Sequence, residues 1–160
     1  MFARNKEVQL ALKDQFRAHT TGRYYLALAH GDVHPGTLRF RLVRDRGDGI
    51  RGITHSPNQG TASVTHVTVV ERLSRCTLIQ CRLETGRTHQ IRIHLAAIGH
   101  PLLGDPVYTR GFVGTLIPCS RTLLHAAYLS FEHPVFRQKK EYEAPLPESF
   151  SAILEQERNG

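Results

Sequence analysis

The sequence predicts one mixed α+β domain, in which helices flank a mostly antiparallel sheet. Three observations support this expectation. The chain has 160 residues, which is the length of one ordinary domain. Runs of residues with the pattern of strands follow one another with only turns or loops between them. Helical spacing of apolar residues occurs near the beginning, after Gly86 and at the end of the chain.

Six runs have the residue pattern of strands. They are residues 23–31, 37–43, 62–73, 75–84, 127–133 and 140–144. The turn sequence DVHPG separates the first two runs, and Ser74 separates the third from the fourth, so each of these two pairs is expected to form an antiparallel hairpin. Residues 44–60 are rich in glycine and charge without apolar periodicity, and they are expected to form a long exposed loop.

Three stretches have helical spacing. Asn5 can cap the first helix, which is expected to end within residues 19–22. The second helix is expected over about residues 88–98, because Gly99 follows its last apolar position. Pro147 is expected to open the last helix.

The charge balance favours a polyanionic partner. Lysine and arginine total 21 against 14 aspartates and glutamates, a formal charge of +7. Arginine supplies 17 of the 21, and its planar guanidinium pairs with phosphates and stacks on bases. RNA or DNA is therefore the favoured partner. The alternative is a basic domain with no such partner.

The remaining composition predicts a protein of the cytoplasm. Three cysteines without a CxxC spacing support neither a disulfide framework nor a zinc ribbon, and they fit reduced thiols. No run approaches the roughly 18 apolar residues of a membrane span. The opening segment is too charged for a secretory signal.

The densest polar cluster is LETGRTHQIRIHL, residues 83–95, where a strand is expected to pass through Gly86 into a helix. Unpaired N–H groups at a helix start favour anions, and the arginines strengthen this preference, so a phosphate or carboxylate is expected there. The alternative is a solvated helix face with arginines present by chance.

Other chemistries find little support. His89 and His94 stand five residues apart, about 140° around a helix, so they cannot share a metal, and no metal site is predicted. The sequence has no GxSxG elbow, which argues against Ser/His/Asp catalysis, and no glycine-rich phosphate motif, which argues against a nucleotide-cofactor enzyme. Asp105 in GHPLLGDPVY is either a turn former or a weak catalytic candidate. Tyr24 and Tyr25 face opposite sides of a strand, and the sequence leaves open which of them faces a cleft.

The segment LETGRTHQIRIHLAAIGHPLLGDPVY closely resembles the signature of RluA-type pseudouridine synthases. The similarity continues through FARNKEVQLALKDQF, RYYLALAHG, LLHAAYLSFEHP and APLPESF, so it covers nearly the whole chain. The resemblance implies an isomerase that converts uridine to pseudouridine in ribosomal or transfer RNA without metal or cofactor. It also implies a mixed sheet with an RNA cleft along one face.

In this family an aspartate within an HRLDxxTSG motif attacks the flipped uridine, and that motif is missing from the sequence. The resemblance places it just upstream of Phe2–Asn5, with Met1 at an apolar position of the following strand. We therefore expect residues 1–160 to form a pseudouridine synthase domain that lacks its N-terminal portion, and to be inactive alone.

The resemblance also implies roles for individual residues. Catalytic roles fall to an arginine that pairs with the missing aspartate and a tyrosine that stacks on the uracil, namely Arg87 and Tyr25. The residues expected to bind RNA, line the base pocket or hold its loop are Arg23, Leu83, His89, Gln90 and Arg92. Arg92 remains an alternative partner for the aspartate. We favour Arg87 because it stands at the corner between strand and helix.

Two further hypotheses remain open. The chain is an RNA-binding remnant that uses its basic cleft without catalysis, in which case its affinity falls steeply with salt. Alternatively, the fragment does not fold stably, because a missing strand exposes unpaired sheet edges.

Overall fold

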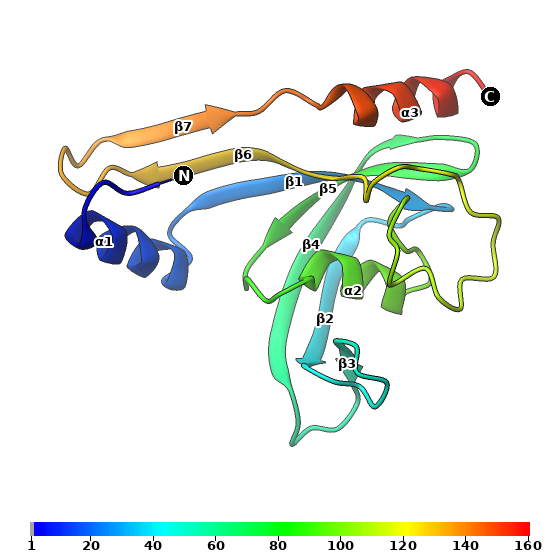
Figure 1. The fold of residues 1–160 in the computed structure, drawn as a ribbon, viewed down its shortest axis with the longest axis horizontal. Coiled ribbons are helices and arrows are strands. Elements are labelled where there is room, and N and C mark those ends of the chain that lie inside the picture. Colours follow the sequence, from blue (N-terminus) through cyan, green and yellow to red (C-terminus); the bar gives the residue numbers. More distant parts are fainter. Residues whose placement is uncertain (1) are drawn as a thin grey trace.

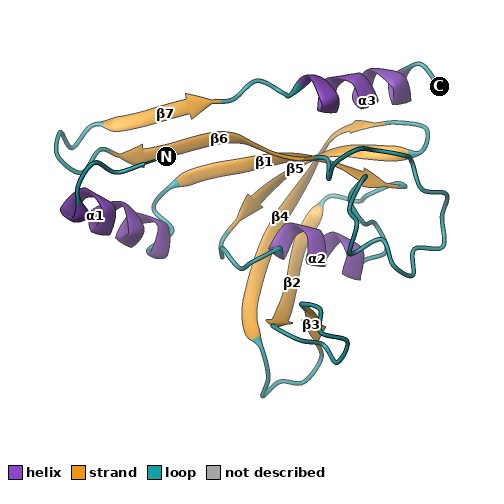
Figure 2. Cartoon of the chain, viewed as in Figure 1, coloured by secondary structure: helices purple, strands orange, loops and turns teal. Residues whose placement is uncertain are grey.

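Seven strands form one sheet in the computed structural model, which describes residues 2–160; the expectation for Met1 lies outside the described residues. The strand order is β3-β2-β4-β5-β1-β6-β7, and every neighbouring pair is antiparallel (Figures 1 and 2). The elements are α1 Lys6–Arg17, β1 Gly22–His30, β2 Gly36–Val43, β3 Gly52–Thr54, β4 Thr61–Arg72, β5 Cys76–Leu83, α2 Gln90–Ala97, β6 Leu124–Glu132, β7 Lys139–Glu143 and α3 Glu148–Arg158. The expected α+β class is therefore confirmed.

The prediction that β1 and β2 form a hairpin is wrong. Both edges of β1 are occupied by other strands, β5 on one side and β6 on the other. The chain that leaves β1 is tied to the start of β5, where Gly31 N–H donates to the Arg75 carbonyl at 2.9 Å and Val33 N–H donates to Thr77 Oγ1 at 3.1 Å. The DVHPG segment therefore carries the chain past β5 and β4 to β2. The second expected hairpin, β4 with β5, is confirmed.

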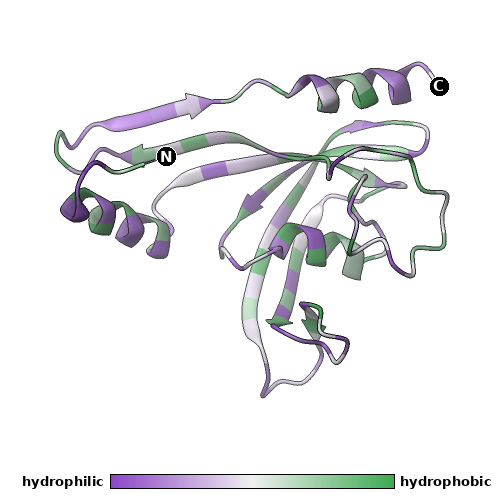
Figure 3. Ribbon diagram, in the orientation of Figure 1, coloured by the Kyte–Doolittle hydropathy of each residue, from purple (hydrophilic) through white to green (hydrophobic). Residues whose placement is uncertain are grey.

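The sheet is covered on both faces. Along β1, Ala27 and Ala29 pack with Ile91 and Leu95 of α2, whereas Leu28 packs with α3 on the other face. This alternation is the two-residue period of a strand. The first half of β5, residues 76–79, is buried on both faces for the same reason, whereas the edge strand β7 is mostly exposed and hydrophilic (Figure 3). The two-sided core fixes the position of α2 against the central strands.

The helices begin and end close to the expected positions. Asn5 caps α1 by accepting a hydrogen bond from Val8 N–H at 2.9 Å. α2 begins two residues later than expected, because His89 adopts a left-handed conformation with φ 59° and cannot continue a helix. Within residues 2–160 no helix is long and apolar enough to cross a lipid bilayer.

The expected long loop over residues 44–60 contains the short strand β3, which pairs with β2. Asp45 Oδ1 closes the turn before it by accepting hydrogen bonds from Gly47 N–H at 2.7 Å and Gly49 N–H at 2.8 Å. Arg46 pairs with Asp48 in the same turn. These local bonds give the loop a defined conformation beside α2.

Candidate functional site

A pocket of about 210 Å³ lies where β1, β5 and β6 meet the start of α2. We call it the central pocket. Six of the seven site residues expected from the sequence line it together with Ile91 and Leu124: Tyr25, Leu83, Arg87, His89, Gln90 and Arg92. Residues 58 or more positions apart in the sequence are brought together because β5 lies directly beside β1.

One wall of the central pocket is apolar. Tyr25 of β1, Leu83 of β5 and Leu124 of β6 pack against the core cluster under α2. Tyr24 points to the opposite face of the sheet, where its ring stacks on Tyr128 with centroids 5.2 Å apart. Tyr25 is therefore the tyrosine that faces the cleft, and its ring is available to stack on a planar ligand.

Gln90 holds the turn between β5 and α2. It is 2% exposed, and its Oε1 accepts from Thr85 Oγ1 at 2.7 Å and from Arg87 N–H at 3.1 Å. Its Nε2 donates to the Val64 carbonyl and to Thr65 Oγ1, both at 3.0 Å. Because these contacts use the whole amide, they support the role of holding the loop rather than contacting phosphate.

Arg92 is already paired. Its Nε and Nη2 donate to the two carboxylate oxygens of Asp105 at 2.6 and 2.7 Å, and the Asp105 side chain is completely buried. Burial alone would raise the pKa of Asp105, but the hydrogen bonds from Arg92 and from the N–H groups of Tyr108 and Val107 hold that pKa below its ordinary value. Asp105 is therefore an ionised residue with a structural role, and the Nε–Nη2 edge of the Arg92 guanidinium is not free to pair with another carboxylate.

His89 and Tyr108 extend this arrangement. The Arg92 guanidinium lies over the Tyr108 ring at 4.9 Å, and the Tyr108 hydroxyl is 3.1 Å from His89 Nδ1. Burial, with the nearby positive charges of Arg92 and Arg51, lowers the pKa of His89 and favours its neutral form. We call Arg92, Asp105, Tyr108 and His89 the Asp105 network.

The two histidines of the motif are separated, as their spacing predicted. His94 lies on the buried side of α2, where its Nε2 is 2.7 Å from Ser63 Oγ. The Ser63 hydroxyl donates to the Phe40 carbonyl at 2.8 Å, so it accepts from His94, which fixes the imidazole as the Nε2–H tautomer.

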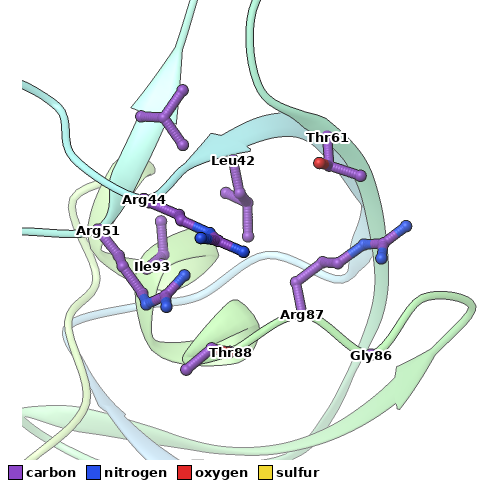
Figure 4. A pocket seen from close by; sticks show the side chains of 9 residues that line it. Leu42, Arg44, Arg51, Thr61, Gly86, Arg87, Thr88 and Ile93 are labelled. Atoms are coloured by element: carbon purple, nitrogen blue, oxygen red, sulfur yellow. The ribbon is translucent and has the colours of Figure 1, made fainter.

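Arg87 differs from Arg92. Its side chain is exposed, and within residues 2–160 its guanidinium has no hydrogen-bonded acceptor. It stands between the central pocket and a second cavity of about 270 Å³ that Arg44 and Arg51 also line (Figure 4). An unpaired cation at the rim of an apolar pocket is suited to a carboxylate or phosphate.

Arg23 is the one expected site residue outside the central pocket. Its guanidinium lies beside Gly86, where an added Cβ would come within 3.2 Å of Nη2, and over the Phe16 ring at 5.5 Å. Arg23 thus belongs to the outer rim. Sequence reasoning missed Arg44 and Arg51, which lie on the loop without periodicity, and the only signal for them was the charge of that loop.

Comparisons with known proteins identify the family of the chain. The family model for RNA pseudouridylate synthase matches residues 1–97. A Bacillus subtilis protein named as an uncharacterised RNA pseudouridine synthase is 40% identical over 157 residues, which cover 97% of this chain and 50% of the relative. The ribosomal large subunit pseudouridine synthase D of Zymomonas mobilis is 35% identical over 95% of this chain and 50% of its own.

Solved structures show the same fold. Human RNA pseudouridylate synthase domain containing 1 superposes with a TM-score of 0.75 at 28% identity, over 91% of this chain and 62% of that one. Human RNA pseudouridylate synthase domain containing 4 gives a TM-score of 0.79 at 19% identity, over 96% of this chain and 69% of that one, which supports the fold alone. The chain spans about half the length of the curated relatives it matches. The RluA-type resemblance is confirmed, and the chain belongs to the RNA pseudouridylate synthase family.

Proposed function

We propose that this chain forms the base-binding and RNA-binding part of an RluA-type synthase that isomerises uridine to pseudouridine in ribosomal or transfer RNA. The observation that carries the proposal is the central pocket, which places the aromatic ring of Tyr25 and the unpaired guanidinium of Arg87 around one small cavity. The family model and the relatives' names support the same reaction class.

The pocket suits a base that has left the RNA stack. Flipping a nucleotide costs a few kcal/mol, and stacking a base on an aromatic side chain returns about 1–3 kcal/mol. Tyr25 supplies the ring, and Leu83 and Leu124 supply apolar contacts around it. The Tyr25 hydroxyl then stands beside the bound uracil, where it assists removal of the proton that leaves C5 when C1′ transfers from N1 to C5.

Arg87 is proposed to pair with the nucleophilic aspartate that the resemblance implies. A guanidinium beside a carboxylate lowers the pKa of the acid, keeps it ionised and fixes its direction. Arg92 is the weaker candidate because Asp105 already occupies it.

The five aspartates of the chain are engaged elsewhere. Asp105 pairs with Arg92 and Asp45 closes a turn, while the other three pair with surface arginines, in the pairs Asp14–Arg17, Asp32–Arg72 and Asp48–Arg46. None of them lines the central pocket. We therefore propose that residues 1–160 alone do not isomerise uridine.

Thiol chemistry offers no substitute nucleophile. Burial raises the pKa of all three cysteines, to about 12 for Cys76 and Cys81, so none forms a thiolate near neutral pH. The proposed location is the cytoplasm, on the ground that an odd number of cysteines without a CxxC spacing fits reduced thiols.

Tritium release from RNA labelled at uracil C5 tests the proposal. The 160-residue chain is expected to release nothing above background. The same chain extended by an N-terminal segment that carries the HRLDxxTSG motif is expected to turn over, and Tyr25→Phe in that longer protein is expected to slow it. An extended protein that binds RNA but never releases tritium would contradict the proposal.

The second candidate function is RNA binding without catalysis. The engagement of all five aspartates favours it for the chain as it stands. RNA affinity that falls steeply with salt, together with an inactive extended protein, would select this alternative. Cooperative thermal unfolding of the 160-residue chain would remove the third hypothesis, that the fragment is not stably folded.

A further inference from the structure

We propose that the second cavity binds one phosphodiester group of an RNA strand whose flipped base occupies the central pocket. We call this cavity the arginine cradle; it is formed by Arg44, Arg51, Arg87, Thr61 and Thr88 above a floor of Leu42 and Ile93. The proposal rests on the proposed function, because it takes the occupant of the central pocket to be a nucleotide.

The cradle gathers arginines from two sides. Arg44 and Arg51 lie on the segment between β2 and β3, whereas Arg87 lies on the segment between β5 and α2 (Figure 4). Figure 4 also shows the guanidiniums of Arg44 and Arg51 near each other on one side of the cavity, whereas the Arg87 side chain extends to the other side. The cavity is about 270 Å³, open to solvent and adjacent to the central pocket through Arg87.

The charges of the cradle are not balanced by the protein. Within residues 2–160 the three guanidiniums have no hydrogen-bonded acceptor, and neither aspartate nor glutamate lines the cavity. Seven other arginines are paired with carboxylates: Arg17, Arg46, Arg72, Arg75, Arg92, Arg137 and Arg158. The remaining seven have no carboxylate partner within residues 2–160, so what distinguishes the cradle is that three unpaired arginines line one cavity. Three like charges around one cavity repel one another, so the site favours an anion that replaces the missing acid.

The backbone that carries the cradle is held in place before any ligand arrives. The turn from Asp45 to Gly49 is closed by the Asp45 carboxylate, and Asp48 ties back Arg46, so the flanking Arg44 and Arg51 start from a fixed backbone. On the other side Gln90 holds Arg87 N–H. A preorganised site loses less conformational freedom on binding, which favours a specific contact over a diffuse attraction.

The chemistry points to a phosphodiester. Guanidiniums grip phosphate oxygens in forked pairs, and the threonine hydroxyls of Thr61 and Thr88 can donate to the same oxygens. A nucleotide whose base enters the central pocket leaves its sugar and phosphate at the entrance of that pocket, beside Arg87, which also lines the cradle. The positive charge of Arg51 also acts on the central pocket, because it contributes to lowering the pKa of His89, which lines that pocket.

Fluorescence binding measurements on the full 160-residue chain test the proposal. The probe is a short labelled oligouridine RNA, and affinity is measured over a series of salt concentrations. The double variant Arg44→Gln/Arg51→Gln is expected to bind about tenfold more weakly and to make the salt dependence shallower by about 0.7 in log–log slope, the share of one phosphate on a single strand.

A matched double variant controls for net charge. Arg39 and Arg82 are exposed, have no hydrogen-bonded partner within residues 2–160 and alternate with residues that face α2, so they lie on the opposite face of the sheet. Arg39→Gln/Arg82→Gln removes the same charge and is expected to change affinity far less. Thermal unfolding of both variants is expected to match the wild type.

A second probe tests the phosphate itself. An oligouridine with uncharged methylphosphonate linkages is expected to bind wild type and the Arg44→Gln/Arg51→Gln variant equally. Equal losses from both double variants, or an equal loss for the uncharged probe, would overturn the cradle. Inorganic phosphate is expected to displace RNA from the wild type more strongly than chloride at the same ionic strength, and to lose this advantage with Arg44→Gln/Arg51→Gln. Phosphate that binds the wild type through these arginines without displacing RNA would assign the site to a free anion and overturn the RNA assignment.

The two proposals fail differently. A wild-type chain that folds but does not bind RNA in a salt-dependent manner counts against the proposed function. A wild-type chain that binds RNA while Arg44 and Arg51 make no difference counts against the cradle alone.

Discussion

Arg92 of the Asp105 network and the three arginines of the cradle all lie around α2, but their charges are satisfied differently. In the Asp105 network, Arg92 is held by a buried carboxylate and covered by an aromatic ring. In the arginine cradle, Arg44, Arg51 and Arg87 have no acid beside them in the described residues. The difference teaches that an arginine whose guanidinium is hydrogen-bonded to a buried carboxylate maintains the shape of the site, whereas an arginine without such a partner is available to bind a ligand.

The difference has an energetic basis. Removing one partner from a buried ion pair leaves a charge without compensation and costs several kcal/mol, whereas an exposed charge is already solvated. Substitutions in the network should therefore damage folding, and substitutions in the cradle should damage binding.

The largest expected effect is that of Asp105→Ala. It leaves Arg92 unpaired and two N–H groups, those of Val107 and Tyr108, without their acceptor. The free energy of unfolding is expected to fall by about 3–5 kcal/mol in urea denaturation. Asp14→Ala, which breaks an exposed pair with Arg17, is the matched control and should not change stability measurably. Equal effects of the two variants would contradict the structural role assigned to the buried Arg92–Asp105 pair.

The next effect is a dependence of stability on pH that comes from the buried side of α2. Burial lowers the pKa of His94 from 6.5 to about 4. Below pH 6.5 the unfolded chain therefore binds a proton at His94 that the folded chain does not bind. The contribution of neutral His94 to the free energy of unfolding is fully present above pH 6.5 and is lost as the pH falls toward 4.

This loss should amount to roughly 3 kcal/mol for His94, at about 1.4 kcal/mol per pKa unit. Burial also lowers the pKa of His30, which adds a loss in the same direction. Urea denaturation at several pH values measures the slope, and His94→Gln should flatten it. A variant that keeps the full slope would show that other groups are responsible.

A smaller effect is expected from Tyr108→Phe. It removes the hydroxyl that contacts His89 Nδ1 but keeps the ring over Arg92. The loss of one hydrogen bond at a partly buried site should cost about 1 kcal/mol. Thermal or urea unfolding measures this cost, and a loss as large as that of Asp105→Ala would mean that the hydroxyl, rather than the ion pair, holds the network together.

The smallest effect on stability is expected from Arg87→Gln, although its effect on RNA binding should be large. The Arg87 side chain makes no hydrogen bond within residues 2–160, so its loss should leave the melting temperature unchanged. RNA affinity and its salt dependence should both decrease. A destabilised Arg87→Gln chain with normal RNA affinity would reverse the roles assigned to the two arginine groups.

The elements of the fold could be predicted from the sequence, but their neighbours could not. Alternation in residues 23–31 and 37–43 identified two strands, yet it carries no information on which strand pairs with which. The turn sequence DVHPG was misleading, because the hydrogen bonds that Gly31 and Val33 donate to Arg75 and Thr77 hold the chain against β5 after β1. β3 was missed because three residues are too few for a periodic pattern.

The site was predicted through the motif and the family resemblance rather than through periodicity. Six expected residues meet in the central pocket, but their roles were separated only by tertiary contacts. Asp105 and Arg92 are neighbours in space across thirteen positions of chain, and nothing local in the sequence indicates that pairing. Arg44 and Arg51 become part of a site only because the sheet brings their loop beside α2.

The insertion of β5 between β4 and β1 sets an order of assembly. β4 and β5 are joined by a short turn, so they are expected to pair early in folding. β1 is expected to pair with β5 later, because the pairing of Ala29 with Thr77 closes a long stretch of intervening chain. Closing that stretch carries an entropic cost that falls late in folding. Tyr25 lies on β1 and Arg87 follows β5, so they stand on opposite sides of this β1–β5 pairing. An RNA that binds both residues would therefore slow the separation of β1 from β5.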